Sequence, residues 1–175
     1  MIAVLRILVV MSVAVFSAAA SGCDRDQRPR SKPMTEEDLI ELNKKRAGRE
    51  SEVLDAFAEK HGMDAVRTKT GIRYEIYARS GQPDSARTGN AVGVTYKAYL
   101  LDSTLVESTG AEPRFFRVGH DDVISGLHEA VTLPALGDSV RMIIPSHLAY
   151  GLTGKSPEVP PNAPLLYDLC LVAIR

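Results

Sequence analysis

Residues 123–168 read VISGLHEAVTLPALGDSVRMIIPSHLAYGLTGKSPEVPPNAPLLYD, and this stretch decides the fold. It predicts a short helix from Ser125 to Val131, a strand from Ser139 to Ile144, a loop that carries Tyr150, a proline-rich turn and the start of a closing strand. The stretch contains no thiol nucleophile, acid–base pair or cluster of metal ligands. Any site built here would therefore be an apolar pocket with a few hydrogen-bond donors.

Upstream of this stretch, apolar and polar residues alternate at 72–78 and 92–100, as they do in half-buried strands. We expect strands at 72–78, 92–100, 105–106, 115–118 and 165–174, with a loop at 81–90. Strands with one packed helix make an α+β domain. The prediction is a mostly antiparallel, twisted sheet wrapped on one short helix, preceded by an N-terminal helical extension.

Several motifs resemble the core signature of the FKBP family of peptidyl-prolyl cis/trans isomerases. They are VISGL at 123–127, GD at 137–138, IPSHLAYG at 144–151 and VPPNA at 159–163, with VGVTY at 92–96 further upstream. The resemblance covers residues 70–175, and TGIRY at 70–74 is similar to the first strand of bacterial envelope FKBPs. It implies an FKBP-like isomerase domain that binds proline-containing polypeptides and uses no cofactor or metal.

The resemblance implies rotation about an Xaa–Pro amide bond, whose barrier is roughly 18–20 kcal/mol. The twisted transition state has lost amide resonance, so its carbonyl is less dipolar. A dry pocket therefore stabilises it relative to the hydrated planar amide, and donors that hold the chain in a turn add orientation. No covalent step is required, which agrees with the lack of a nucleophile in residues 123–168.

The resemblance also assigns catalytic residues. The Tyr150 hydroxyl and the Ile124 backbone N–H would donate hydrogen bonds to the substrate, Tyr96 would line the pocket, and Leu127 would form its floor. Judged from the residues alone, Tyr96, Leu127 and Ile124 are equally typical of a core. Tyr150 is different, because packing alone poorly explains an Ala-Tyr-Gly loop.

The resemblance assigns further substrate-binding residues, which flank the catalytic ones. These are Val123, Val106, Glu107, Val159 and Tyr167. By itself, Tyr167 would be an ordinary sheet aromatic.

Some positions depart from the family pattern. The family's Phe-Asp pair is Val106-Glu107 here, Arg114 aligns with an aromatic wall position, and Lys155 and Glu158 replace a His and an Ile at the rim. The pocket loses aromatic surface and gains charge, so we expect reduced activity and weak macrolide binding. Two functions stay open: a working isomerase for exported or envelope proteins, or a non-catalytic FKBP-like binding module or chaperone for proline-containing segments.

Residues 1–22 predict a secretory signal peptide. Arg6 precedes an apolar run, Ile7–Phe16, that is too short to span a membrane. Ala20-Ser21-Gly22-Cys23 resembles a bacterial lipobox, which implies a lipid on Cys23 and a membrane-anchored protein that faces the periplasm or the exterior. The alternative is ordinary cleavage that leaves Cys23 as a free thiol. More than one acyl chain would anchor the protein stably.

The polar residues 23–34 predict a flexible tether. Residues 35–69 predict a helical segment, in which Thr35 caps a first helix and a second run ends near Gly62, with an interruption at Gly48. The segment would either pack on its own domain or serve as a dimerisation arm. Interlocking arms of envelope FKBPs are longer, so we expect a monomer.

Composition excludes a basic nucleic-acid-binding protein. The net charge is −1, and removing Arg6 with the signal peptide makes it −2 (20 basic against 22 acidic side chains). Cys170, in an apolar run, is predicted to be a small buried hydrophobic residue. His120-Asp121-Asp122 could suggest a metal site, but a solvated turn is the favoured interpretation.

Overall fold

The computed structural model describes residues 34–175. The predicted signal peptide, Cys23 and all but the last residue of the predicted tether lie outside the described residues. The described elements follow one another as α2 (Glu36–Lys60), β1 (Val66–Arg67), β2 (Arg73–Ala78), β3 (Ala91–Leu100), β4 (Leu105–Ser108), β5 (Arg114–Arg117), α3 (Ser125–Ala130), β6 (Ser139–Ile144), the 3-10 helix η1 (Ser146–Leu148) and β7 (Leu165–Ile174).

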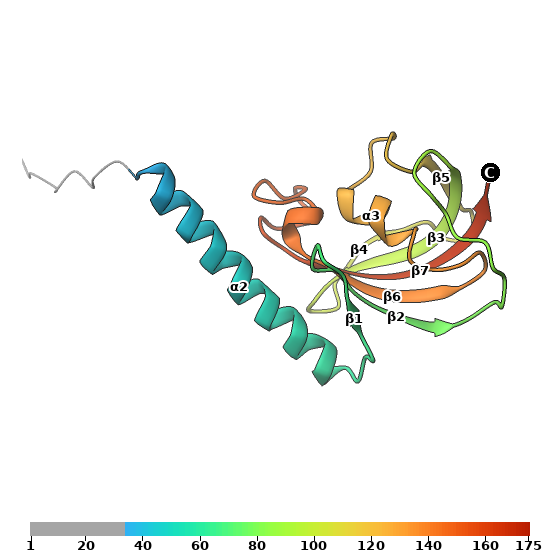
Figure 1. Cartoon of the computed structure of the whole chain (residues 1–175), viewed down its shortest axis with the longest axis horizontal. Coiled ribbons are helices and arrows are strands. Elements are labelled where there is room, and N and C mark those ends of the chain that lie inside the picture. The colour runs from blue at the N-terminus through green and yellow to red at the C-terminus, as the bar shows by residue number, and fades with distance from the viewer. Residues whose placement is uncertain (1–33) are drawn as a thin grey trace, which may run out of the picture. The chain divides into compact units, whose positions relative to one another are not determined.

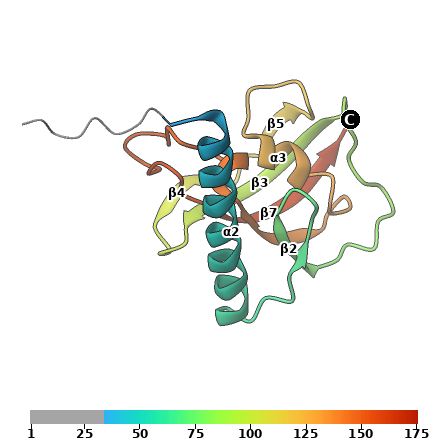
Figure 2. The same ribbon diagram turned by 60° about the vertical axis from the view of Figure 1, so that its left-hand side comes forward.

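The strands form one antiparallel sheet in the order β1-β2-β6-β7-β3-β4. Strand β5 lies off this path and pairs with β3. The helix α3 lies against the sheet in both ribbon views (Figures 1 and 2). This arrangement confirms the predicted α+β fold, and β2, β3, β6 and β7 lie where strands were expected.

Two short strands share one edge of β3. Strand β5 pairs with residues 91–94 of β3, and β4 pairs with residues 97–99. The other edge of β3 pairs along its length with β7. Side chains of β3, β4 and β5 are thereby brought side by side, although the strands are separated by turns in the chain.

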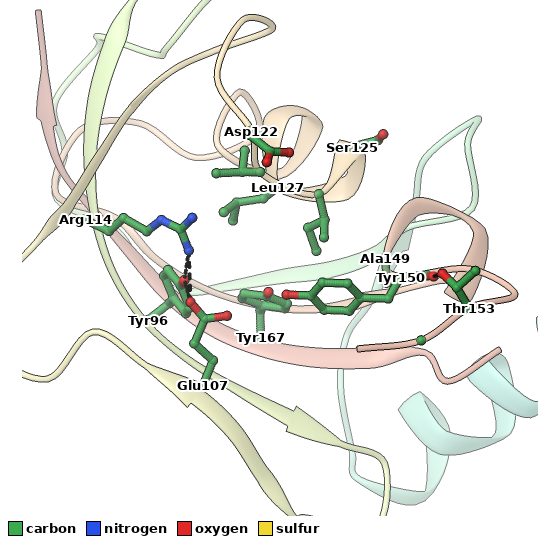
Figure 3. Close-up of a pocket in the computed structure, with 13 residues that line it drawn as sticks. Tyr96, Glu107, Arg114, Asp122, Ser125, Leu127, Ala149, Tyr150, Thr153 and Tyr167 are labelled. Carbon is green, nitrogen blue, oxygen red and sulfur yellow. Dashed lines mark hydrogen bonds and ion pairs between the residues drawn. The ribbon is translucent and has the colours of Figure 1, made fainter. Parts of the chain in front are cut away.

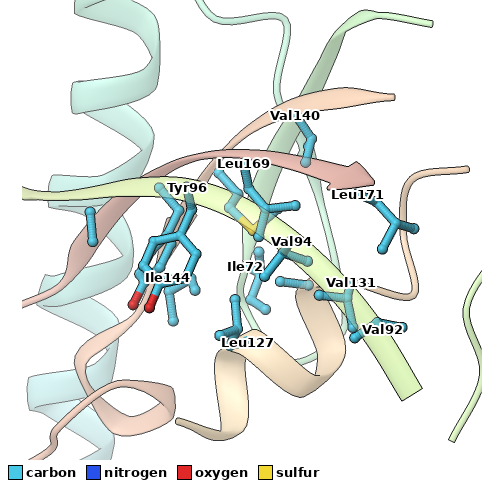
Figure 4. Packing of buried hydrophobic residues seen from close by; sticks show 14 of the residues in the cluster. Ile72, Val92, Val94, Tyr96, Leu127, Val131, Val140, Ile144, Leu169 and Leu171 are labelled. Carbon is cyan, nitrogen blue, oxygen red and sulfur yellow. The ribbon is translucent and has the colours of Figure 1, made fainter. Parts of the chain in front are cut away.

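The main core lies between α3 and the sheet. Leu127 of α3 is 1% exposed and packs with buried residues that include Ile72, Val94 and Leu169 (Figure 4). Gly126 permits the close approach of the helix, since a Cβ at this position would overlap the Ile144 side chain of β6. The short helix is therefore held by apolar burial, which is the main favourable contribution to folding.

Burial alternates along strand β7, with Cys170 on the less buried face. Leu169 and Leu171 are buried, whereas Cys170 is half-buried and its Sγ lies 4.0 Å from the Gly137 carbonyl oxygen. The prediction that Cys170 is a buried hydrophobic residue was wrong, because it is only half-buried. The apolar run hid the fact that alternate residues of β7 face opposite sides.

Helix α2 is continuous, which corrects the predicted interruption at Gly48. Gly48 is exposed, a Cβ added there would meet no atom within 4 Å, and one exposed glycine costs a helix only about 1 kcal/mol. The predicted Thr35 cap is confirmed: the Asp38 N–H donates to Thr35 Oγ1 at 3.2 Å, and Asp38 Oδ2 accepts from the Thr35 N–H at 3.0 Å. Among residues 34–175, no helix is both long and apolar enough to cross a membrane.

The compact unit Leu39–Arg175 contains most of α2 together with the sheet. Leu54 and Ala58 of α2 pack with Met63 and with Ile143 of β6. The neighbours of Ile143 in β6 belong instead to the core beneath α3, so α2 covers the opposite face of this strand. The interpretation that the helix packs on its own domain is confirmed. The sheet begins before residue 70, because β1 pairs with β2.

Arg73 departs from the expected pattern of a half-buried strand. It is 2% exposed, and its guanidinium donates to Asp55 Oδ1 at 2.8 Å, to the Ser51 carbonyl at 2.9 Å and to the Gly71 carbonyl at 2.6 Å. Ile72 beside it is also buried. Both faces are covered at this end of β2, which a local period of two could not indicate.

Candidate active site

A cavity of about 460 Å³ opens between α3, the sheet and the loop after η1 (Figure 3). The strands contribute one side, the start of α3 contributes the opposite side, and the loop closes one end. The lining residues are Tyr96, Glu107, Arg114, Asp122, Val123, Ile124, Ser125, Leu127, Ala149, Tyr150, Thr153, Gly154 and Tyr167.

The structure brings together most of the site residues expected from the sequence. Those that line the cavity are Tyr96, Glu107, Val123, Ile124, Leu127, Tyr150 and Tyr167. Val106 and Val159 do not line it. Val106 packs half-buried against the main core, and Val159 is 2% exposed within that core.

The position of Val159 follows from the fold of its loop. Its N–H donates to the Lys155 carbonyl at 2.7 Å, and its own carbonyl accepts from the Lys155 N–H at 2.9 Å. Gly154 has φ +66°, and a Cβ there would overlap the backbone of residues 159–161. The loop thus folds back tightly on itself, and Val159 is turned into the core.

Sequence reasoning missed several lining residues. They are Asp122, Ser125, Ala149, Thr153 and Gly154. Each stands within three or four residues of a predicted site residue, so proximity along the chain was a signal. Which of these neighbours faces the cavity depends on the turn geometry, and that was not readable from the sequence.

One wall of the cavity is a charged hydrogen-bond network. The Tyr96 hydroxyl donates to Glu107 Oε1 at 2.6 Å, and Arg114 Nη1 donates both to this carboxylate oxygen and to the Tyr96 hydroxyl, each at 2.9 Å (Figure 3). Lys155 Nζ lies 3.7 Å from Glu107 Oε2. The network exists because β4 and β5 pair with the same edge of β3. It leaves the Tyr96 proton engaged with a protein acceptor.

Burial raises the pKa of Tyr96 to about 12, and the hydrogen bond to Glu107 adds to this effect while Arg114 opposes it. Burial also raises the pKa of Tyr167, with a further contribution from the nearby Tyr96 and Tyr150. Both phenols are therefore neutral at physiological pH. Their rings present uncharged surface to the cavity.

Two of the donors expected from the sequence lack a partner among residues 34–175. The Tyr150 hydroxyl makes no side-chain hydrogen bond, and the Ile124 N–H donates to no backbone carbonyl. Figure 3 shows the Tyr150 ring extending from its loop toward Tyr167. The loop is ordered by hydrogen bonds from the Gly154 N–H and the Thr153 hydroxyl to the Tyr150 carbonyl, both at 3.2 Å.

The described residues offer binding chemistry at this site. Leu127 and Ile124 give apolar surface, Tyr96 and Tyr167 give ring faces, and Tyr150 gives a free hydroxyl. Within residues 34–175, no three His, Cys, Asp or Glu side chains gather as metal ligands would. At the His120-Asp121-Asp122 sequence, Asp121 Oδ2 accepts from the Arg117 N–H at 2.7 Å, as in an ordinary turn.

Residues 82–172 match the family model described as FKBP-type peptidyl-prolyl cis-trans isomerase. FK506-binding protein 4 of Dictyostelium discoideum is 35% identical over 115 residues, covering 66% of this chain and 31% of that protein. The isomerase FkpA of Escherichia coli K12 is 31% identical over 126 residues, covering 71% and 44%. Isomerase FKBP15-1 of Arabidopsis thaliana is 31% identical over 122 residues, covering 69% and 77%.

A crystal structure of FkpA from Escherichia coli superposes with a TM-score of 0.62 at 26% identity, covering 79% of this chain and 64% of that chain. The chain spans only about a third to a half of the length of the Dictyostelium and Escherichia relatives. The family model nevertheless matches more than half of the chain, over the same residues that build the cavity. The resemblance in the motifs is thus confirmed, and the chain belongs to the family of FKBP-type peptidyl-prolyl cis-trans isomerases.

Proposed function

We propose that this protein is a peptidyl-prolyl cis/trans isomerase that assists the folding of exported or envelope proteins. The observation that carries the proposal is the pair of donors, the Tyr150 hydroxyl and the Ile124 N–H, that lack a partner among residues 34–175 and line the same cavity. A polypeptide segment with proline in the cavity would accept hydrogen bonds from both. Its Xaa–Pro amide would be held in a turn and removed from water.

The proposed mechanism is electrostatic and conformational. The planar amide is the more dipolar state and loses more hydration on entering an apolar site than the twisted amide does. Leu127 would form the floor under the proline ring, with Tyr167 and Tyr96 as ring faces beside it. Tyr150 and Ile124 would bind the carbonyls that flank the bond. Val123 and Glu107 would contact the substrate at the cavity mouth.

A second function is favoured by the charged wall. Glu107, Arg114 and Lys155 place ions where an apolar wall would best exclude water. A hydrated wall weakens the preference for the twisted amide. The alternative is therefore a non-catalytic FKBP-like binding module or chaperone for proline-containing segments, and the same wall predicts weak macrolide binding.

A protease-coupled assay on Xaa-Pro peptides separates the two functions. We expect the purified full chain, kept in mild detergent, to accelerate cis-to-trans conversion above the uncatalysed rate. A Leu127→Ala variant should lose activity, and its fold is checked by circular dichroism because this change opens a core cavity. If the peptides bind but their cis-to-trans conversion stays at the uncatalysed rate, the isomerase is rejected and the binding module is supported.

We further propose that the protein is a monomer, anchored in the cell envelope by lipid on Cys23. The support is the signal-like segment 1–22 and the lipobox-like residues that end at Cys23. Globomycin treatment or Cys23→Ala should block maturation and release the protein from the membrane fraction. An unchanged product size and an unchanged membrane fraction would reject the lipid anchor. Sedimentation in detergent tests the monomer.

A further inference from the structure

The loop that carries Tyr150 is attached to α2 by Glu50. Glu50 Oε1 accepts the Ser146 backbone N–H at 2.6 Å, and Oε2 accepts the Ser146 hydroxyl at 2.9 Å. Ser146 begins η1, is 6% exposed and lies four residues before Tyr150. Both oxygens of one carboxylate are thus used on a single residue that is 96 positions away along the chain.

Ser146 in turn holds both neighbours of Tyr150. Its carbonyl accepts the Ala149 N–H at 3.0 Å and the Gly151 N–H at 2.9 Å. A displacement of Ser146 would therefore move the backbone on each side of the tyrosine. The Tyr150 hydroxyl has no partner of its own among residues 34–175 to restore its position.

The start of η1 has no cap from its own segment. The residue before it is Pro145, which makes no side-chain hydrogen bond to the helix. Without Glu50, the buried Ser146 N–H would have no acceptor, and a buried unpaired donor is unfavourable. Hydrogen bonds to an ionised carboxylate are stronger than neutral ones. Glu50 therefore supplies, from α2, an interaction that the loop cannot supply locally.

A separate contact seats α2 without touching the loop. Asp55 Oδ1 accepts a hydrogen bond from Arg73 Nε of β2 at 2.8 Å, and it forms an ion pair with Arg73 Nη2 at a distance of 2.7 Å. The Asp55–Arg73 contact and the Glu50–Ser146 contact can thus be broken independently. One acts on the sheet, and the other acts on the loop.

We propose that Glu50 is a positioning residue for the isomerase, which sets the Tyr150 hydroxyl through Ser146 and so makes the seating of α2 part of the site. The effect on catalysis rests on the proposed function. The coupling between α2 and the loop does not, and it can be measured without any turnover.

The kinetic test compares variants of the full chain. We expect Glu50→Ala to lower kcat about tenfold with little change in KM, because a small misplacement of a catalytic group is costly. Glu50→Gln should recover most of the rate, since its amide oxygen can accept the Ser146 N–H and its NH₂ can donate to the hydroxyl. Glu52→Ala, exposed on the same helix, is the matched control. Asp55→Asn loosens the helix elsewhere and should lower stability while preserving kcat.

A wild-type kcat in Glu50→Ala, or an equal loss of kcat in Asp55→Asn, would overturn the positioning role. The second outcome would mean that only general docking of α2 matters. If Glu50→Ala fails to fold, Ser146→Ala replaces it, because this change removes one of the two bonds and keeps the backbone contact. It should then give a smaller loss of kcat.

Amide hydrogen exchange, followed by NMR, tests the coupling directly. In Glu50→Ala the amides of Ser146, Ala149 and Gly151 should exchange at least about tenfold faster than in the unaltered chain. The amide of Met142, central in β6, should not change. If the three loop amides exchange at the same rate in Glu50→Ala as in the unaltered chain, the proposal is overturned, even if the enzyme is active. If the unaltered chain has no isomerase activity, the proposed function fails and this measurement alone decides the coupling.

Discussion

Replacing Tyr150 by Phe removes one hydroxyl that faces the cavity and retains the ring. Since this hydroxyl has no partner among residues 34–175, no protein group is left unsatisfied. The stability of the fold should therefore change by less than about 0.5 kcal/mol. The substrate, however, loses one hydrogen bond to its carbonyl.

A neutral hydrogen bond contributes roughly 0.5–1.5 kcal/mol net. Because 1.36 kcal/mol corresponds to a tenfold change in rate, kcat/KM should fall by about 2- to 12-fold in Tyr150→Phe. The protease-coupled assay measures this ratio, and thermal unfolding measures the stability. Both measurements use the same full-length preparation.

Tyr96→Phe is the matched control, because its hydroxyl is engaged with Glu107 and Arg114 rather than free. Its removal should lower stability by about 1 kcal/mol, with a smaller effect on kcat/KM than in Tyr150→Phe. An unchanged kcat/KM in Tyr150→Phe, or a stability loss larger than that of Tyr96→Phe, would refute the assignment of Tyr150 as the free donor.

The double variant Glu107→Val and Arg114→Phe replaces the ion pair by an apolar wall. It should raise kcat/KM at least about threefold (about 0.7 kcal/mol) and strengthen macrolide binding. The protease-coupled assay and a macrolide titration measure these effects, and a lower kcat/KM would contradict the prediction. The pKa of Tyr96 is raised to about 12 by burial, above the roughly 10 of an unfolded chain, so its contribution to stability is complete below pH 10 and is lost as the pH rises toward 12. Between pH 8 and pH 11, the free energy of unfolding measured in urea should fall less in Tyr96→Phe than in the unaltered chain. Equal decreases would show that Tyr96 is not the source of the pH dependence. Gly126→Ala should destabilise the fold by about 1–3 kcal/mol, because its Cβ would overlap a side chain of β6, whereas Gly48→Ala should stabilise the exposed helix by up to about 1 kcal/mol; chemical denaturation of both variants tests the contrast.

The candidate site was predictable where one short motif supplies both the residue and its backbone. Ile124 and Leu127 come from the start of α3, and Tyr150 comes from the loop that follows η1. The order and spacing of the motifs sufficed for these. Val159 also lies in a motif, but the loop turns it into the core, because mutual hydrogen bonds with Lys155 set its direction.

The sequence identified the residues of the charged wall as departures from the family pattern, but it did not predict the contacts between them. Glu107 and Arg114 were recognised as departures from the family pattern, yet their joint hydrogen bonds to Tyr96 depend on two strands that pair with one edge of β3. Strand pairing joins residues that are distant in the chain. No local pattern encodes which edge is shared.

The sequence by itself determined the class of fold, the long strands, the short helix and the family, because side-chain periodicity and spaced motifs are local properties of the chain. Tertiary structure alone decided that α2 runs unbroken past Gly48, that Arg73 is buried beneath it, and that Glu50 reaches Ser146. The physical reason is that burial and hydrogen bonding depend on what covers a residue. For Arg73 and Ser146 the cover is a helix from a remote part of the chain, whereas Gly48 is exposed and a single glycine is too weak a break to end the helix.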